Sequence, residues 1–195
     1  MAHDDLKSIV FNEAIFEMAD ADGVDLDGST HTFLARLCRV ENGVNSHPGH
    51  HADAGAEHNT NIRKDRMDDF VLLDHVFAGT VGVDDHAYLA TDGHSTRDDQ
   101  VLTGVSIAKV VTGDNNYIEF KAEETTWLQV DGSVNAAGVL IYRRAGANIT
   151  AADDIPICFI KFTAEIDPDK SDLTVKWGGT ATDALSGPIL KLQQG

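Results

Sequence analysis

The chain has 195 residues, of which 42% are hydrophobic, and this suits one ordinary domain or one domain with a long arm. Its 32 acidic and 15 basic residues give a formal net charge of −17. We expect so acidic a protein to have no nucleic-acid partner, because DNA binding depends on cationic side chains that displace counterions. No apolar run approaches the ~20 residues of a membrane helix. The acidic start, Met1 to Asp5, also lacks the basic segment of a signal peptide, so we expect a soluble protein with no membrane partner.

The N-terminal half of the sequence predicts few clear elements. The segment from Leu6 to Met18 fits a helix or an extended arm equally well. Phe33 to Val40 and Phe70 to Phe77 could each be a strand, and Tyr88 to Ala90 is a shorter candidate. Residues 42–69 are polar, with almost no large apolar side chain. A structureless loop of that length is usually functional, disordered or ordered by a neighbouring subunit.

From about Gly104 onward, apolar and polar residues alternate between turn residues, as in a β-protein. We expect an antiparallel β-sandwich or jelly-roll-like domain over residues 104–195, preceded by an N-terminal arm and loop-rich β region over residues 1–103. Pro156 should lie at a strand start or an edge, because it has no N–H group to donate. The pattern predicts strands at 105–111, 117–121, 126–130, 138–143, 155–162, 173–177 and 189–192. The expected core comprises Val105, Ile107, Tyr117, Phe120, Val139, Ile141, Ile157, Phe159, Val175 and Trp177.

Two segments invite a metal-site interpretation. The loop from His47 to His58 holds four histidines near Asp53 and Glu57, and zinc accepts imidazole and carboxylate ligands. A solvated polar loop is the favoured interpretation, because no helical HExxH motif or regular element holds these ligands in place. The acidic run from Asp20 to Gly28 resembles a calcium loop. It lacks the Gly at the sixth position and the Glu at the twelfth, so we expect turns there instead.

No catalytic constellation is evident in the sequence. It contains no GxSxG, GxxxxGK[ST] or GxGxxG motif. The Asp74–His75 and Asp85–His86 pairs are adjacent residues, which a strand would send to opposite faces. Glu123 and Glu124 are more typical of solvent-facing charge than of a glycosidase carboxylate pair. We therefore expect no enzyme, with no catalytic, cofactor-binding or metal-binding residues and no cofactor.

The two cysteines, Cys38 and Cys158, lie far apart in the sequence, and neither belongs to a CxxC motif. Both have apolar neighbours, which favours buried free thiols. A disulfide between them remains the alternative.

Several C-terminal segments together resemble the small β-rich virion proteins of tailed phages and viruses. The first is Tyr117 to Trp127, which is similar to a stretch in those proteins that ends in Trp. Gly138 to Arg144 and Ile155 to Phe162 are similar to their hairpin, although Arg143, Arg144 and Lys161 replace acidic residues there. The segments 172–177 and 187–192 resemble their closing strands. The order and spacing agree from Tyr117 to the C-terminal segment.

This resemblance implies a virion structural protein, and the strong acidity favours a capsid decoration or cement subunit on the outside of the head. The implied partner is the major capsid protein, and residues 1–103 would make the contacts to the capsid or to neighbouring subunits. The expected assembled form is a homo-oligomer, preferably a trimer. Such a protein is made in the host cytoplasm and ends on the capsid exterior. A tail, neck or head-fibre component is an alternative within the same class. A host-surface carbohydrate-binding module is an alternative from another class, although aromatic residues make up only 7% of the chain.

Overall fold

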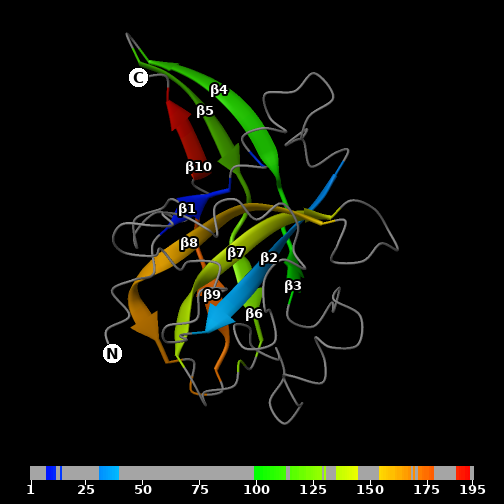
Figure 1. The fold of residues 1–195 in the computed structure, drawn as a ribbon, viewed down its shortest axis with the longest axis vertical. Coiled ribbons are helices and arrows are strands. Elements are labelled where there is room, and N and C mark those ends of the chain that lie inside the picture. The colour runs from blue at the N-terminus through cyan, green and yellow to red at the C-terminus, as the bar shows by residue number, and fades with distance from the viewer. Residues whose placement is uncertain are drawn as a thin grey trace, which may run out of the picture.

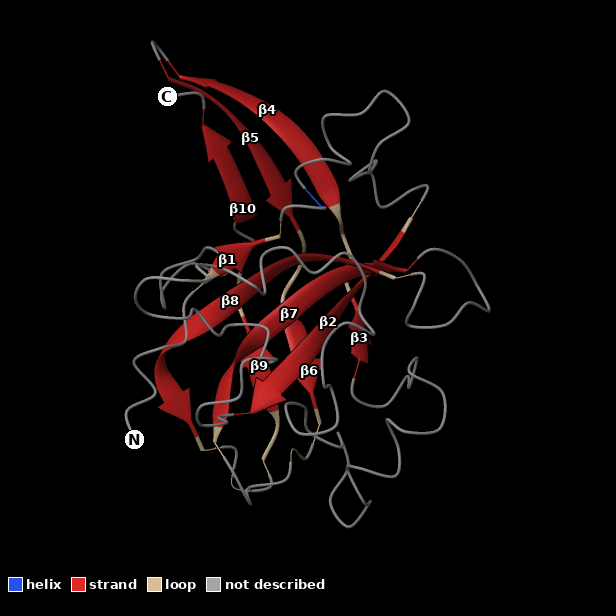
Figure 2. Cartoon of the chain, viewed as in Figure 1, coloured by secondary structure: helices blue, strands red, loops and turns tan. Residues whose placement is uncertain are grey.

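The structure is a computed structural model of the chain. It describes residues 8–11, 14, 31–39, 99–112, 115–128, 130, 135–144, 154–167, 169, 171–177 and 188–193. The described strands form three sheets, and every pairing between them is antiparallel (Figure 2). They are β1 (Ile9–Val10), β2 (Thr32–Arg39), β3 (Asp99–Val101), β4 (Ser106–Thr112), β5 (Asn115–Lys121), β6 (Thr125–Trp127), β7 (Ala136–Arg144), β8 (Ile155–Ile166), β9 (Leu173–Val175) and β10 (Pro188–Gln193).

These strands confirm the mainly antiparallel β-class predicted from the sequence. Each of the seven strands expected after Gly104 is present as one of β4 to β10, and the candidate Phe33 to Val40 is present as β2. Within the ambiguous segment from Leu6 to Met18, Ile9 and Val10 are extended. Pro156 is the second residue of β8, at the strand start where it was expected. The strand candidates at 70–77 and 88–90 lie outside the described residues.

The largest sheet has five strands in the order β1-β8-β7-β2-β3 (Figure 1). Its centre is the β7–β8 hairpin, in which Leu140 is paired with Phe159 and Ile141 with Cys158. Strand β2 joins the other side of β7 over its whole length, from Thr32 opposite Arg144 to Arg39 opposite Ala136. Segments from both sides of the expected boundary at 103/104 therefore share this one sheet.

One face of the five-stranded sheet packs on a core shared with the two smaller sheets. Side chains of alternate residues lie on this face, including Phe33 of β2 and Ile141 of β7. Against them pack Phe120 of β5, Trp127 of β6 and Trp177 beyond β9, each at most 3% exposed. The rings of Phe33 and Phe120 lie 5.1 Å apart between centroids and are tilted by 60°, a geometry favourable for aromatic pairs. Trp177 also donates a hydrogen bond from Nε1 to Thr125 Oγ1 at 3.2 Å.

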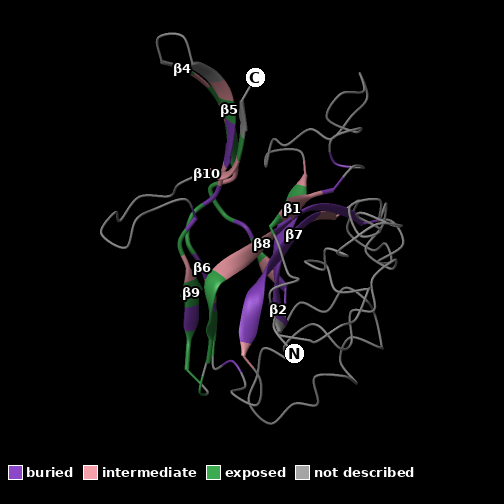
Figure 3. Ribbon diagram, turned by 60° about the vertical axis from the view of Figure 1, so that its left-hand side comes forward, coloured by how far each residue is buried: buried purple, intermediate pink, exposed green. Residues whose placement is uncertain are grey.

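The opposite face of the same sheet is buried as well. Leu34, Cys38, Leu140, Tyr142 and Phe159 lie on this face and are each at most 2% exposed. Strand β7 is consequently buried at seven successive positions (Figure 3), whereas a strand with one face in water alternates between buried and exposed residues. Both faces of the five-stranded sheet thus carry buried apolar side chains.

Close packing on this second face explains Gly138 in β7. A Cβ atom at Gly138 would lie 2.3 Å from the backbone oxygen of Ile160 and 2.7 Å from Cζ of Phe159. The Phe159 ring therefore occupies the space that any larger residue at position 138 would need.

The three-stranded sheet, in the order β10-β5-β4, projects away from the rest of the described chain (Figures 1 and 3). Its lower end enters the core at Phe120, but the strands continue well beyond it. The prediction of Ile107 as a core residue is wrong, because this side chain is 46% exposed. Val105, Tyr117 and Val175, also expected in the core, are only partly buried, and Phe120, Val139, Ile141, Ile157, Phe159 and Trp177 are buried as expected.

Candidate functional site

Most residues considered for metal binding or catalysis from the sequence fall outside the described part of the chain. This holds for the histidine loop from His47 to His58, the acidic run from Asp20 to Gly28, and the Asp–His pairs at 74–75 and 85–86. Among the described residues, no three His, Cys, Asp or Glu side chains gather closely enough to hold a metal ion.

Glu123 and Glu124 lie among the described residues, and each contacts a different partner. Glu123 Oε2 accepts a hydrogen bond from Thr103 Oγ1 at 2.9 Å, and its side chain lies over Gly104, which has a φ of +60°. Glu124 Oε2 lies 3.8 Å from Lys176 Nζ in an exposed ion pair. The two carboxylates thus tie different segments to the loop before β6 rather than facing a common reacting group.

Cys38 and Cys158 are both free and buried. Cys38 is opposite Gly138 and lies on the second face of the sheet, whereas Cys158 is opposite Ile141 and lies on the core face. The sheet itself separates the two sulfur atoms, so the disulfide left open by the sequence does not form. Burial raises the pKa of each thiol to about 12, and a protonated thiol is a poor nucleophile and metal ligand.

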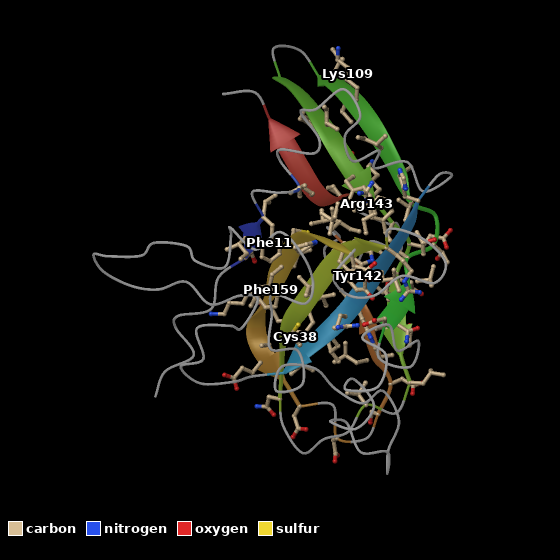
Figure 4. The ribbon with its side chains drawn as sticks, turned by 45° about the vertical axis from the view of Figure 1, so that its right-hand side comes forward. Phe11, Cys38, Lys109, Tyr142, Arg143 and Phe159 are labelled. Atoms are coloured by element: carbon tan, nitrogen blue, oxygen red, sulfur yellow. The ribbon has the colours of Figure 1, made fainter. Side chains whose placement is uncertain are left out.

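The most organised polar group in the described chain is a buried cluster of Arg36, Asp99 and Tyr142. Arg36 of β2 donates from Nε to Oδ1 of Asp99 at 2.5 Å and also from Nη2 to Oδ2. Tyr142 of β7 donates its hydroxyl to the same Oδ2 at 2.6 Å. Its ring also lies under the guanidinium, with 5.4 Å between Arg36 Cζ and the ring centroid. Figure 4 labels Tyr142 in this region.

Sheet register brings the three residues of this cluster together. Arg36 is directly opposite Asp99 across β2 and β3, and Tyr142 is opposite Leu34, two residues before Arg36. All three side chains therefore lie on the second face of the sheet. Arg36 and Tyr142 are fully buried, and Asp99 is 3% exposed.

The cluster places the Arg36–Asp99 ion pair beside a neutral phenol. Burial, together with the negative charge of Asp99, raises the pKa of Tyr142 well above its ordinary value. Tyr142 therefore stays protonated and donates its hydrogen bond throughout the neutral range. A buried ion pair adds little net stability against well-packed apolar residues, but loss of one partner leaves an uncompensated charge in the interior. The arrangement thus suits a clamp that fixes β3 on β2.

Only a weak signal in the sequence points to this cluster. Arg36 interrupts the apolar run from Phe33 to Cys38, and a basic residue inside a strand buried on both faces needs an acidic partner. The partner could not be named, because Asp99 belongs to a short strand in a polar stretch with no alternation of its own.

Arg143 and Arg144, adjacent at the end of β7, are half-buried and do not form one cationic site. Arg143 is opposite Phe33 and Ile155, whereas Arg144 is opposite Thr32. As neighbours in a strand, they point to opposite faces of the sheet. Figure 4 labels Arg143 near the base of the projecting sheet.

The projecting sheet presents the other distinctive surface of the described chain. We define the projecting face as Ile107, Lys109, Val111 and Ile118, which alternate on one side of β4 and β5. Ile107, Val111 and Ile118 are 46%, 66% and 41% exposed. On the reverse side, Lys191 Nζ lies 3.6 Å from the centroid of Tyr117, and Lys121 pairs with Glu119 at 2.5 Å. The apolar side of this sheet is thus the one left open.

No family model matches the chain, and neither a curated protein nor a solved structure matches it. Among the described residues, no helix is long and apolar enough to cross a membrane.

Proposed function

We propose that this protein is a virion structural protein, a capsid decoration or cement subunit that stabilises the head shell of a tailed virus. The observation that carries the proposal is the projecting face, which exposes three large apolar side chains on the sheet that projects from the rest of the described chain. Single exposed apolar residues are ordinary, but contiguous ones on one surface mark a contact with another protein. In this role, the projecting sheet attaches the subunit to the shell.

The sequence resemblance supports the same class. Its segments coincide with β5 and β6, with the β7–β8 hairpin, with β9 and with β10. The aromatic ends of two of these segments, Trp127 and Trp177, pack in the shared core. The resembling residues are thus the ones that build a body of this kind, and the shape we assign to it is the sandwich or jelly-roll type expected from the sequence.

The formal charge of −17 is compatible with a position on the outside of a shell. A charge of this size keeps an isolated subunit soluble and apart from nucleic acid. The proposed partner is the major capsid protein, and the site of action is the capsid exterior after synthesis in the host cytoplasm.

The decisive experiment is binding to shells. The major capsid protein of the virus that encodes this chain would be assembled into empty shells, incubated with the purified full-length chain and sedimented. We expect saturable co-sedimentation and extra density on the outer surface in cryo-electron microscopy. The sheet variant Val111→Asp should bind less, and Ser106→Asp, which adds the same charge on the reverse side of β4, should bind normally.

Three results would redirect the proposal. A chain that does not sediment with shells, but is found by antibody labelling on tails or necks of whole particles, would be a tail, neck or head-fibre component. Retention on a glycan array with no affinity for shells would identify a carbohydrate-binding module. A chain that binds neither viral particles nor glycans would not belong to this class of proteins.

A further inference from the structure

The projecting sheet is held on the core mainly through one fully buried aromatic side chain. Phe120 of β5 is 1% exposed and packs on Phe33 of β2. Ile107, opposite Phe120 on β4, is 46% exposed. The other apolar residues at the base of the sheet are only partly buried against the core: Val105, Ile189 and Leu190. A sheet held chiefly at one point can rotate about that point, so its direction depends on a second attachment.

Such a second attachment lies where the chain enters β4 and leaves β5. The N–H group of Glu123 donates a hydrogen bond to the carbonyl oxygen of Thr103 at 2.9 Å. Glu123 Oε2 accepts another from Thr103 Oγ1, also at 2.9 Å. The two segments are thus tied together through the main chain and through side chains. We call Thr103, Gly104 and Glu123 the joint.

Gly104 makes room for the Glu123 side chain within the joint. Its φ of +60° lies in the left-handed region, which glycine adopts without a steric cost. A Cβ atom at Gly104 would lie 2.7 Å from Cγ of Glu123 and 2.9 Å from its Cδ. The Glu123 side chain therefore lies in space that any larger residue at position 104 would fill.

Buried polar contacts hold the chain on the side of the joint away from the projecting sheet. Before the joint, Asp99 of β3 is bound by Arg36 and Tyr142. After the joint, Thr125 of β6 is 6% exposed and accepts a hydrogen bond from Trp177 Nε1 at 3.2 Å. The joint is thus attached to fixed points along both segments of the chain.

We propose that the joint fixes the direction in which the projecting sheet leaves the five-stranded sheet, with Glu123 as the positioning residue. Phe120 supplies one attachment and the joint supplies the other, and two attachments prevent the rotation that one allows. The projecting face is then held in one orientation before a partner arrives, which lowers the ordering cost of binding. This goes beyond the proposed function, because it concerns the isolated chain whatever the projecting face contacts.

The direction of the projecting sheet can be measured as a distance. Lys109, near the tip of the sheet in Figure 4, follows Gly104 by five residues, or about 17 Å at about 3.4 Å per residue. A rotation of about 20° at the joint would therefore displace Lys109 by roughly 6 Å. Double electron–electron resonance on the full-length chain would use nitroxide labels at Lys109→Cys and at Ala164→Cys, an exposed position of β8. The natural chain, whose Cys38 and Cys158 are buried, is the labelling blank.

With the joint intact, we expect one narrow distance distribution. Glu123→Ala should widen it by up to roughly 6 Å, because the variant loses the side-chain bond to Thr103. Thr103→Val removes the donor with little change of shape, so it should widen the distribution equally, and the double variant should widen it no further. Glu123→Gln should keep the natural width, because its amide oxygen still accepts. Glu124→Ala is the matched control, since it removes the same charge from an exposed pair with Lys176 outside the joint.

Thermal melting of each variant must first show an unchanged fold, as expected for the exposed Thr103 and Glu123. A broad distribution for the intact joint would overturn the proposal. Natural width in both Glu123→Ala and Thr103→Val would do the same, because packing at Phe120 would then be sufficient. Equal widening by Glu124→Ala would also overturn it, since any loss of charge would then have the effect. Shell binding is measured separately, and a chain that holds its direction but ignores shells refutes only the decoration role.

Discussion

The five-stranded sheet and the three-stranded sheet are both built from strands rich in apolar residues, yet one is buried on both faces and the other leaves one face open. Strands β2 and β7 carry large apolar residues at consecutive positions, and burial follows at each of them. Strands β4 and β5 carry apolar residues of the same kinds, but Ile107, Val111 and Ile118 remain exposed. Apolar alternation therefore specifies a strand and its faces. Alternation does not specify whether another part of the structure covers that face.

The largest loss of stability is expected in the buried five-stranded sheet, when the charge partner of Arg36 is removed. Asp99→Ala leaves the Arg36 guanidinium and the Tyr142 hydroxyl without their buried acceptor, and we expect a loss of about 3–5 kcal/mol in the free energy of unfolding. Urea denaturation followed by fluorescence would measure this loss. The control is the double variant Arg36→Met with Asp99→Leu, which should be far more stable than the single variant. A single-variant loss under about 1 kcal/mol would mean that the pair is solvated.

The next largest effect is expected at the N-terminal edge of the five-stranded sheet. Phe11 is fully buried, and its N–H donates to the carbonyl oxygen of Ile157 at 3.0 Å. Phe11→Ala should lower the free energy of unfolding by about 3 kcal/mol, because it leaves a cavity in the packed interior. The exposed Leu128→Ala, at 63% exposure, should change it by less than about 0.5 kcal/mol. If the two variants behaved alike, residues near β1 would not belong to the same cooperative unit as β8.

Alkaline titration probes both faces of the five-stranded sheet through Cys38 and Cys158. Burial raises the pKa of each thiol in the folded chain to about 12, from an ordinary value of 9.0. The unfolded chain therefore releases its thiol protons first, so the contribution of these two thiols to stability is constant well below pH 9 and falls as the pH rises from 9 toward 12. We expect about 1 kcal/mol lost per thiol between pH 9 and pH 10. Chemical denaturation at several pH values should show a shallower decline in Cys158→Ala, and an unchanged slope would contradict the assignment.

The smallest effect on folding is expected on the projecting sheet. Val111→Asp should change the free energy of unfolding by less than about 1 kcal/mol, because the side chain is 66% exposed and has little packing to lose. Ile141→Asp in the core, as the comparison, should prevent folding, since it buries an unpaired charge. A strongly destabilised Val111→Asp variant, judged by its melting temperature, would mean that the projecting sheet is covered in the monomer.

Sequence reasoning predicted the strands well where pattern and turns act locally. The strands β4, β5, β7 and β8 alternate or run apolar for many residues, so their positions follow from short-range signals. Strand β3 carries no such signal, because Asp99 to Val101 become a strand only through pairing with β2. The expectation of a core position for Ile107 failed for a related reason: alternation gives the face on which a side chain lies, but not whether that face is covered. The domain boundary at 103/104 and the histidine loop stay predictions.

The pairing of β2 with β7 has a kinetic consequence. Cys38 pairs with Gly138, one hundred positions later in the chain, so β2 is made long before its neighbour. At the usual rate of about 5–20 residues per second, roughly 5–20 s of synthesis separate the two strands. During that time Phe33, Leu34 and Leu37 have no β7 to cover them, and the loop to be closed is long. Folding of this sheet is thus a late and slow event that waits for the β7–β8 hairpin, and high-level expression would expose β2 to aggregation before the hairpin arrives.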